Sequence, residues 1–271
     1  MRFVTILALL FSFLSQGQEL RLKELYTLKN KNFTTYTPDV LDNIYMVAGD
    51  EIIKYSPEGK EMARYSSPDL MSIDFLDAFI SLDLLVYYKT YYRTIIVDNQ
   101  LNAKTPVIPL DDHGLMDVQL VRSADENKVW LYDQSTDQMA LFNLYTRKKE
   151  IESLRISQIT GLQTRPNYLV YTINRIYLNL PGQGIMMFDL FGNYQRTLPV
   201  VVAYKFQVIN YLVYYVQDNF LIVYNPDLRS EVRYALEELL LGGEILLGKN
   251  RLYCLRKGEL KAYEFHLLGV D

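Results

Sequence analysis

Four carboxylates stand out as candidate metal ligands. They are Asp39, Asp69 and the adjacent Asp111 and Asp112, which precede His113. Carboxylate oxygens are the ligands that calcium prefers, so these residues would form a cation site if the fold brought them together. Acidic residues are also common in ordinary turns. The corresponding loops of the second half of the chain offer no matching acids; they contain Ser157, Gln158, Val201, Val202, Gly242 and Gly243.

Other catalytic arrangements have weaker support in the sequence. The two histidines, His113 and His266, are too few for a zinc triad. The chain contains no His-Glu-x-x-His motif, no Gly-x-Ser-x-Gly motif and no glycine-rich phosphate loop. Cys254 lies in the apolar stretch 252–255, which favours a buried, unreactive thiol. His113 remains an alternative general base, but the residues favour a protein without catalytic activity and without a cofactor.

Tyrosines and cations gather in residues 87–93, a segment typical of a hairpin. Aromatic and arginine side chains dominate the binding energy of protein interfaces, so Tyr91, Tyr92 and Arg93 are the candidate partner-binding residues. A sugar ring that stacks on the tyrosines is an alternative ligand. Tyr87 and the single tryptophan, Trp130, belong to strongly apolar runs and are predicted to lie in the core.

The first 17 residues have the pattern of a signal peptide. Arg2 is followed by an apolar run from Phe3 to Leu14, and Ser15, Gln16 and Gly17 form a small-x-small cleavage site. This run is much shorter than the about 20 residues that span a bilayer. We therefore expect an exported protein, periplasmic or associated with the outer membrane, whose residues 18–271 form a single domain. The net charge of −4 argues against nucleic acid as a partner.

A repeated motif defines the elements that must position these residues. An aliphatic residue precedes an aromatic one in six places, 37 to 47 residues apart. A second apolar run, closed by a polar residue and a turn, follows each copy in the same phase. The period of about 42 residues, built from short runs, is typical of β-propeller blades, each a four-stranded antiparallel sheet. The central aromatics of the six copies are Tyr45, Tyr87, Trp130, Tyr177, Tyr214 and Tyr253.

The two ends of the chain predict how the ring closes. The last unit supplies three strands, near residues 244–247, 252–255 and 259–265, while residues 20–28 form an unassigned strand. Pairing residues 20–28 with residues 259–265 would complete the sixth blade and cover an exposed edge. The sequence therefore predicts an all-β, six-bladed propeller closed by its N-terminal strand.

One stretch resembles a known architecture. Residues 53–60 contain Tyr55, a polar Ser56 and the pair Gly59 and Lys60, and this is similar to the strand and turn of NHL-type and gluconolactonase-like six-bladed propellers. Gly192 and Asn193 repeat the turn in the fourth unit. Six-bladed lactonases of this architecture hold a calcium ion with Asp, Glu and Asn, which implies Asp39, Asp69, Asp111 and Asp112 as candidate ligands, in loops between blades that converge on the central channel.

Three functions follow from these observations, since architecture alone does not determine activity. The first is a non-catalytic envelope scaffold that binds another protein, by analogy with propellers of outer-membrane assembly or secretion complexes. The second is a propeller that binds a carbohydrate or small ligand. The third is a calcium-dependent lactonase or hydrolase. The lack of catalytic groups and the tyrosine-rich segment favour the first.

Overall fold

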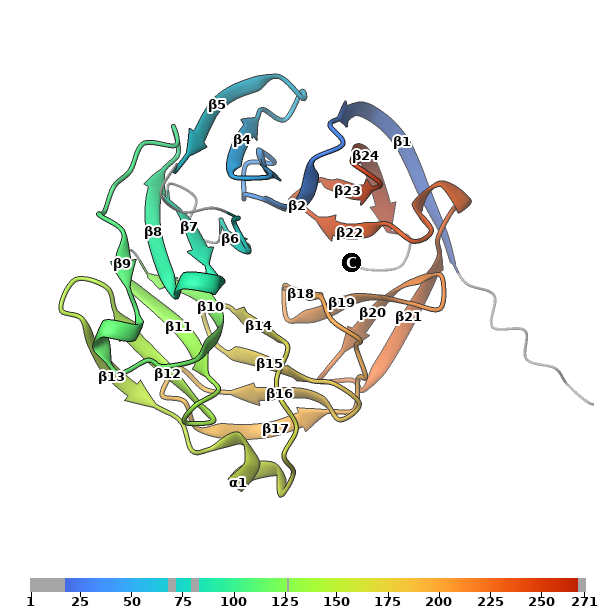
Figure 1. Ribbon diagram of the computed structural model, residues 1–271. Helices are drawn as coiled ribbons and strands as arrows, with labels where there is room; N and C mark the ends of the chain where they lie inside the picture. Colours follow the sequence, from blue (N-terminus) through green and yellow to red (C-terminus); the bar gives the residue numbers. More distant parts are fainter. Residues whose placement is uncertain (1–17, 68–71, 79–82, 126, 268–271) are drawn as a thin grey trace, which may run out of the picture.

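The computed structural model describes residues 18–67, 72–78, 83–125 and 127–267. Their strands form six four-stranded antiparallel blades arranged in a ring around a central channel (Figure 1). Within blades one to five the strands follow one another from the channel outward in chain order, and in blade six the N-terminal strand takes the outermost place. The predicted six-bladed propeller is confirmed.

The first three blades are formed by consecutive strands. Blade one consists of β2 (Phe33–Pro38), β3 (Ile44–Ala48), β4 (Glu51–Tyr55) and β5 (Glu61–Ser66). Blade two consists of β6 (Phe75–Asp77), β7 (Asp83–Tyr88), β8 (Arg93–Asp98) and β9 (Ile108–Pro109). Blade three consists of β10 (Val118–Asp125), β11 (Lys128–Asp133), β12 (Gln138–Asn143) and β13 (Lys148–Glu152).

The last three blades complete the ring. Blade four consists of β14 (Tyr168–Tyr171), β15 (Ile176–Leu180), β16 (Gly184–Phe188) and β17 (Tyr194–Leu198). Blade five consists of β18 (Phe206–Ile209), β19 (Leu212–Gln217), β20 (Phe220–Asn225) and β21 (Ser230–Ala235). Blade six consists of β22 (Glu244–Leu247), β23 (Arg251–Arg256), β24 (Glu259–Leu267) and β1 (Gln18–Lys29). The described helices are short: η1 (Lys89–Tyr91), η2 (Asp111–His113), α1 (Ile156–Thr160) and η3 (Glu238–Leu240).

The N-terminal strand closes the ring, as the sequence predicts. β1 pairs antiparallel with β24 from Leu20–Leu267 to Lys29–Glu259, and its first residues also pair with β21 of blade five. Figure 1 shows the blue N-terminal strand beside the red C-terminal strands. This pairing joins the two ends of the chain and covers the edge of β24.

The repeated aromatics explain why the blades stack. In the described residues the core divides into six clusters, and each combines side chains from two adjacent blades. Each cluster contains one of the six aromatics of the repeat, and Tyr87 and Trp130 are almost completely buried, as predicted. Every residue of β3 and β7 is buried, because a middle strand has a neighbouring blade on each side. This explains the continuous apolar runs.

Hydrogen bonds from side chains to backbone reinforce the junction between blades one and six. The Tyr36 hydroxyl bonds to the carbonyl oxygens of Glu244 and Tyr253, at 2.9 and 2.8 Å. The Asp42 carboxylate accepts a hydrogen bond from the backbone N–H of Lys249, at 2.8 Å. These hydrogen bonds connect the two blades through buried polar groups, which makes the packing specific.

Deleting residues 19–28 tests whether β1 holds the ring together. Removal of this strand exposes the edge of β24 and the apolar surface that β1 covers. We expect aggregation or a fall of more than 10 °C in the melting temperature, measured by circular dichroism. The substitution Lys23→Ala is the control, because this side chain is exposed and its ion pair with Glu264 lies in solvent. A truncated protein that melts with the full-length chain would contradict the closure.

Candidate functional site

Two cavities occupy the central channel. The larger, of about 560 Å³, lies at the end where the loops join the first and second strands of the blades, including the loop 39–43. The smaller, of about 440 Å³, lies toward the connections between blades, near Asn167 and Tyr204. Arg122 on β10 and Tyr168 on β14 line both cavities and form part of the partition between them.

Arg122 is held by aromatic rings from the blades on either side. Its guanidinium carbon lies 4.2 Å from the ring centre of Phe75 in blade two and 4.7 Å from that of Tyr168 in blade four. Its Nε donates a hydrogen bond to the carbonyl oxygen of Leu169. The side chain is only 12% exposed. Cation–π contacts stabilise such a desolvated cation.

Asp77 provides the nearest carboxylate to Arg122. Its Oδ1 lies 3.7 Å from Arg122 Nη1, and its Oδ2 accepts a hydrogen bond of 2.8 Å from the backbone N–H of Ser123. Asp77 therefore offsets the charge of Arg122 and connects blades two and three. The sequence analysis missed both residues, because their importance depends on aromatic neighbours from other blades.

The structure places Asp39 in a turn within blade one, between β2 and β3, and not between blades as the sequence analysis assumed. Its Oδ1 accepts hydrogen bonds from the N–H groups of Leu41 and Asn43, and its Oδ2 accepts one from the Asn43 side chain, all within 2.9 Å. The same turn recurs from Asp98 to Asn102 and from Asp189 to Asn193. An Asp four residues before an Asn was the sequence signal that would have identified it.

The described acidic candidates lie at opposite ends of the blades. Asp111 and Asp112 belong to η2, in the connection from blade two to blade three, and Asp111 pairs with Arg93. His113 in the same helix lies 6.0 Å from the ring of Phe142. Asp69 falls outside the described residues. Within the ranges that the structure describes, no three His, Cys, Asp or Glu side chains form a group that could hold a metal ion.

The tyrosine segment is partly buried and partly exposed. Tyr91 is 40% exposed, but Tyr92 adopts a left-handed backbone conformation and packs against the core between blades two and three. The Tyr92 hydroxyl donates a hydrogen bond of 3.1 Å to Asp117, and Arg93 binds Asp111. Two of the three candidate partner-binding residues are thus engaged in contacts within the protein.

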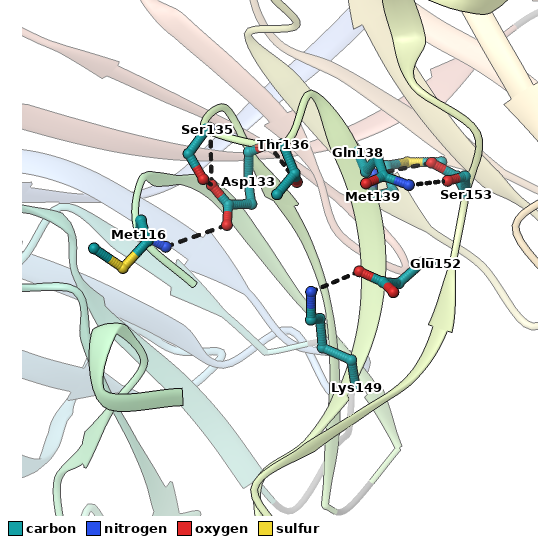
Figure 2. A network of polar contacts seen from close by, with 9 residues as sticks. All are labelled: Met116, Asp133, Ser135, Thr136, Gln138, Met139, Lys149, Glu152 and Ser153. Carbon is teal, nitrogen blue, oxygen red and sulfur yellow. Dashed lines mark hydrogen bonds and ion pairs between the residues drawn. The ribbon is translucent and has the colours of Figure 1, made fainter. Parts of the chain in front are cut away.

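A buried carboxylate fixes the loops beside this segment. Asp133 accepts hydrogen bonds from the backbone N–H groups of Met116, Asp117 and Ser135, and from the Ser135 hydroxyl. Figure 2 shows Asp133 between Met116 and Ser135. The arrangement joins the loop between blades to the turn after β11. Asp133 therefore has a structural role.

Apolar side chains project from the turns of three consecutive blades. The four most exposed large apolar side chains of the described residues lie in connections between the first and second, or third and fourth, strands of blades three to five. We call them the blade-turn residues: Tyr145 (85% exposed), Ile173 (76%), Phe191 (73%) and Leu228 (75%). Single exposed apolar side chains are common on proteins, and it is the grouping of these four at one end of three neighbouring blades that makes them candidates for partner contacts.

The turns hold three of these residues in fixed positions. The backbone N–H of Tyr145 donates to Asn143 Oδ1 at 3.0 Å, that of Phe191 to Asp189 Oδ1 at 2.9 Å, and that of Leu228 to Asn225 Oδ1 at 3.0 Å. Each exposed side chain therefore starts from a backbone that is already ordered. A preordered surface loses less conformational entropy when it binds.

Comparison with known proteins identifies the architecture and nothing finer. No family model and no curated protein sequence matches the chain. The structure resembles virginiamycin B lyase from Staphylococcus aureus, with a TM-score of 0.61, 9% identity and coverage of 91% of this chain and 99% of the lyase. It also resembles a streptogramin B lyase, with a TM-score of 0.57, 14% identity and coverage of 86% and 79% of the two chains.

A structure outside the lyases matches comparably well. The Pan2 WD40 domain of Neurospora crassa has a TM-score of 0.55 and 10% identity, covering 86% of this chain and 74% of that domain. Identities this low show the propeller fold, which supports both catalytic and binding proteins. Among the described residues, no helix is long and apolar enough to cross a membrane.

Replacing Tyr91 and Tyr92 separately tests their different environments. Tyr92→Ala removes core contacts and the hydrogen bond to Asp117, so we expect a loss of about 1–3 kcal/mol in the free energy of unfolding. Tyr91→Ala, the matched control, should change it by less than about 0.5 kcal/mol. Urea denaturation measures both. Equal losses would contradict the structural role of Tyr92.

Alkaline pH should destabilise the protein. Burial raises the pKa of Cys254 to about 11 and the pKa of Tyr26 and Tyr215 to about 12, above the values of about 8.5 and 10 in an unfolded chain. Above pH 9 the unfolded chain therefore binds fewer protons than the native one, and the free energy of unfolding falls as pH rises. Urea denaturation between pH 8 and 10.5 measures this slope. Cys254→Ala should reduce it below pH 10, and a flat profile would overturn the burial argument.

Proposed function

We propose that this protein is a non-catalytic scaffold that is exported to the cell envelope and binds another protein there. The propeller fold supports a role in protein interaction, as does the concentration of the most exposed apolar side chains on adjacent blade turns. Export is supported by the signal-peptide pattern of residues 1–17.

The observation that carries this proposal is the exposure of the four blade-turn residues. Leaving such side chains in water gives no benefit to folding, whereas burying them against a partner gains about 25 cal/mol per Å² of apolar surface. Tyr145 and Phe191 are aromatic, the type of residue that is enriched in the centre of interfaces. Because their backbone is held by the turns, the surface needs little rearrangement to bind.

The side chains that could take part in catalysis have structural roles instead. Asp39 is enclosed by donors of its own turn, Asp133 fixes two loops, and Cys254 is buried with a raised pKa. Each of these side chains has a structural role that accounts for its position. We therefore expect the protein to act through its exposed surface, where the turns order the backbone of the residues that bind the partner.

Substituting three blade-turn residues tests the proposed surface. We expect the triple variant Tyr145→Ser, Phe191→Ser and Leu228→Ser to keep the wild-type melting temperature but to lose the partner, because a few aromatic and aliphatic anchors carry most of the binding energy at an interface. The partner is identified by cross-linking in the native cells, followed by affinity capture and mass spectrometry. Its binding to each purified variant is then measured by calorimetry.

Controls from the opposite end of the blades separate this surface from its alternatives. Met116→Ser with Leu154→Ser removes exposed apolar side chains from connections between blades, and this variant should keep the partner. Tyr91→Ala tests the tyrosine segment. If the blade-turn variant keeps its affinity and Tyr91→Ala loses it, the partner binds at the tyrosine segment instead. If all variants bind equally, the proposed surface is wrong.

A further inference from the structure

The larger channel cavity has a mainly apolar wall and a cation, Arg122, at its inner end. Its wall is formed mainly by aliphatic and aromatic residues of blades four, five and six, among them Val170, Phe206, Val208, Leu246 and Leu247. Its volume of about 560 Å³ is within the range of small-molecule binding sites, which are mostly apolar with a few polar groups that orient the ligand. The cavity can therefore enclose a small organic molecule.

The rim of the cavity adds further apolar surface. Val40 and Leu41, in the turn that Asp39 stabilises, are 50% and 60% exposed and line the cavity. The Asp39 turn fixes their backbone through the N–H of Leu41. The exposed Lys249 lies at the rim on blade six. An entering ligand thus meets ordered apolar residues and a cation.

At the inner end of the cavity, the guanidinium of Arg122 is the group that would orient a ligand. A guanidinium has five N–H donors, and the described contacts of Arg122 use Nε at hydrogen-bond distance, while Nη1 lies 3.7 Å from Asp77. That separation exceeds a hydrogen bond, so the pair leaves donor capacity at the guanidinium edge. The rings of Phe75 and Tyr168 lie close to the guanidinium carbon, and the planar set of N–H donors of a guanidinium suits a carboxylate.

The two carboxylates that line the cavity, Asp39 and Asp77, both accept hydrogen bonds from the protein. The Asp39 carboxylate is directed into its own turn, where the N–H groups of Leu41 and Asn43 and the Asn43 side chain surround it. Asp77 is stabilised by the Ser123 N–H, so its charge is partly compensated without Arg122. The formal charges of these two carboxylates balance those of Arg122 and Lys249, so the group that would orient an anion is the guanidinium of Arg122 and not a net positive charge of the cavity.

We propose that this cavity binds a small organic carboxylate with an apolar body, its carboxylate at Arg122 and its body against blades four to six. This ligand site uses residues other than those of the proposed protein partner site, because the blade-turn residues do not line the cavity. The propeller would then have two binding regions, one in the channel and one on the turns.

Three probes that differ in the head group test the proposal on the wild-type protein. Octanoate, 1-octanol and octylammonium have the same apolar chain, with a negative, neutral and positive head group. Isothermal titration calorimetry should show saturable binding of one octanoate per chain, and at least tenfold weaker binding of the other two. Equal affinity for octanoate and octanol, or no saturable binding of octanoate, would overturn the proposal.

Variants then locate the probe. Val208→Trp fills the cavity and should abolish octanoate binding without altering Arg122, whereas Arg122→Lys keeps the charge but removes the planar donor edge and should weaken binding at least tenfold. Arg165→Gln is the matched control: it removes a cation that lines the smaller cavity alone, and it should leave the affinity unchanged.

The melting temperature of each variant shows whether it is folded. Val208→Trp and the three head groups decide the question even if Arg122→Lys does not fold. Octanoate binding that survives in a folded Val208→Trp variant, or that falls equally in Arg165→Gln, would place the probe outside the larger cavity and refute the assignment.

Discussion

The packing of each blade against the next is the constraint on which this structure depends. The middle strands bury both faces, and each core cluster of the described residues is shared by two adjacent blades. A single blade would expose an apolar surface on each side, so the stability of the ring arises between blades and not within them. For this reason the pairing of β1 with β24 is important to the whole ring. Without it, the sixth blade lacks its outer strand. Because β1 continues along the chain into blade one, this pairing also ties the last blade to the first.

Rigidity follows from this packing and determines what the loops can do. The turns project from strands that are hydrogen-bonded to one another, and Asp39, Asp98 and Asp189 hold three of the turns with the same hydrogen-bond pattern. A residue in such a turn can remain apolar and exposed without disordering the backbone. Phe191 and Leu41 occupy the same place in their turns, two residues after the Asp. The turn supplies the conformation, and the side chain at that position is left open to selection for binding.

The sequence predicts the ring well, because the residues that pack between blades recur at a regular spacing. Tyr87 and Trp130 recur in phase and are buried between blades, and residues 20–28 remained unpaired until the ring was closed. The inner strands were harder to predict, since β6 has three residues and β14 has four. The turn containing Asp39 was assigned to a connection between blades because the inner strand before it, β2, was not predicted. Tyr91 and Tyr92 look equivalent in the sequence, but the left-handed conformation at Tyr92 directs its side chain toward Asp117.

Arg122 shows why the channel could not be predicted. It is a lone cation in its strand, and its environment is created by Phe75 and Tyr168, more than 40 residues away on either side. A propeller brings one inner strand of each blade to the channel, so short segments that are far apart in the sequence line it together. None of these segments carries a recognisable motif by itself. The chemistry of the channel therefore depends on the closure of the ring, and the same interblade packing that stabilises the fold also assembles the cavity.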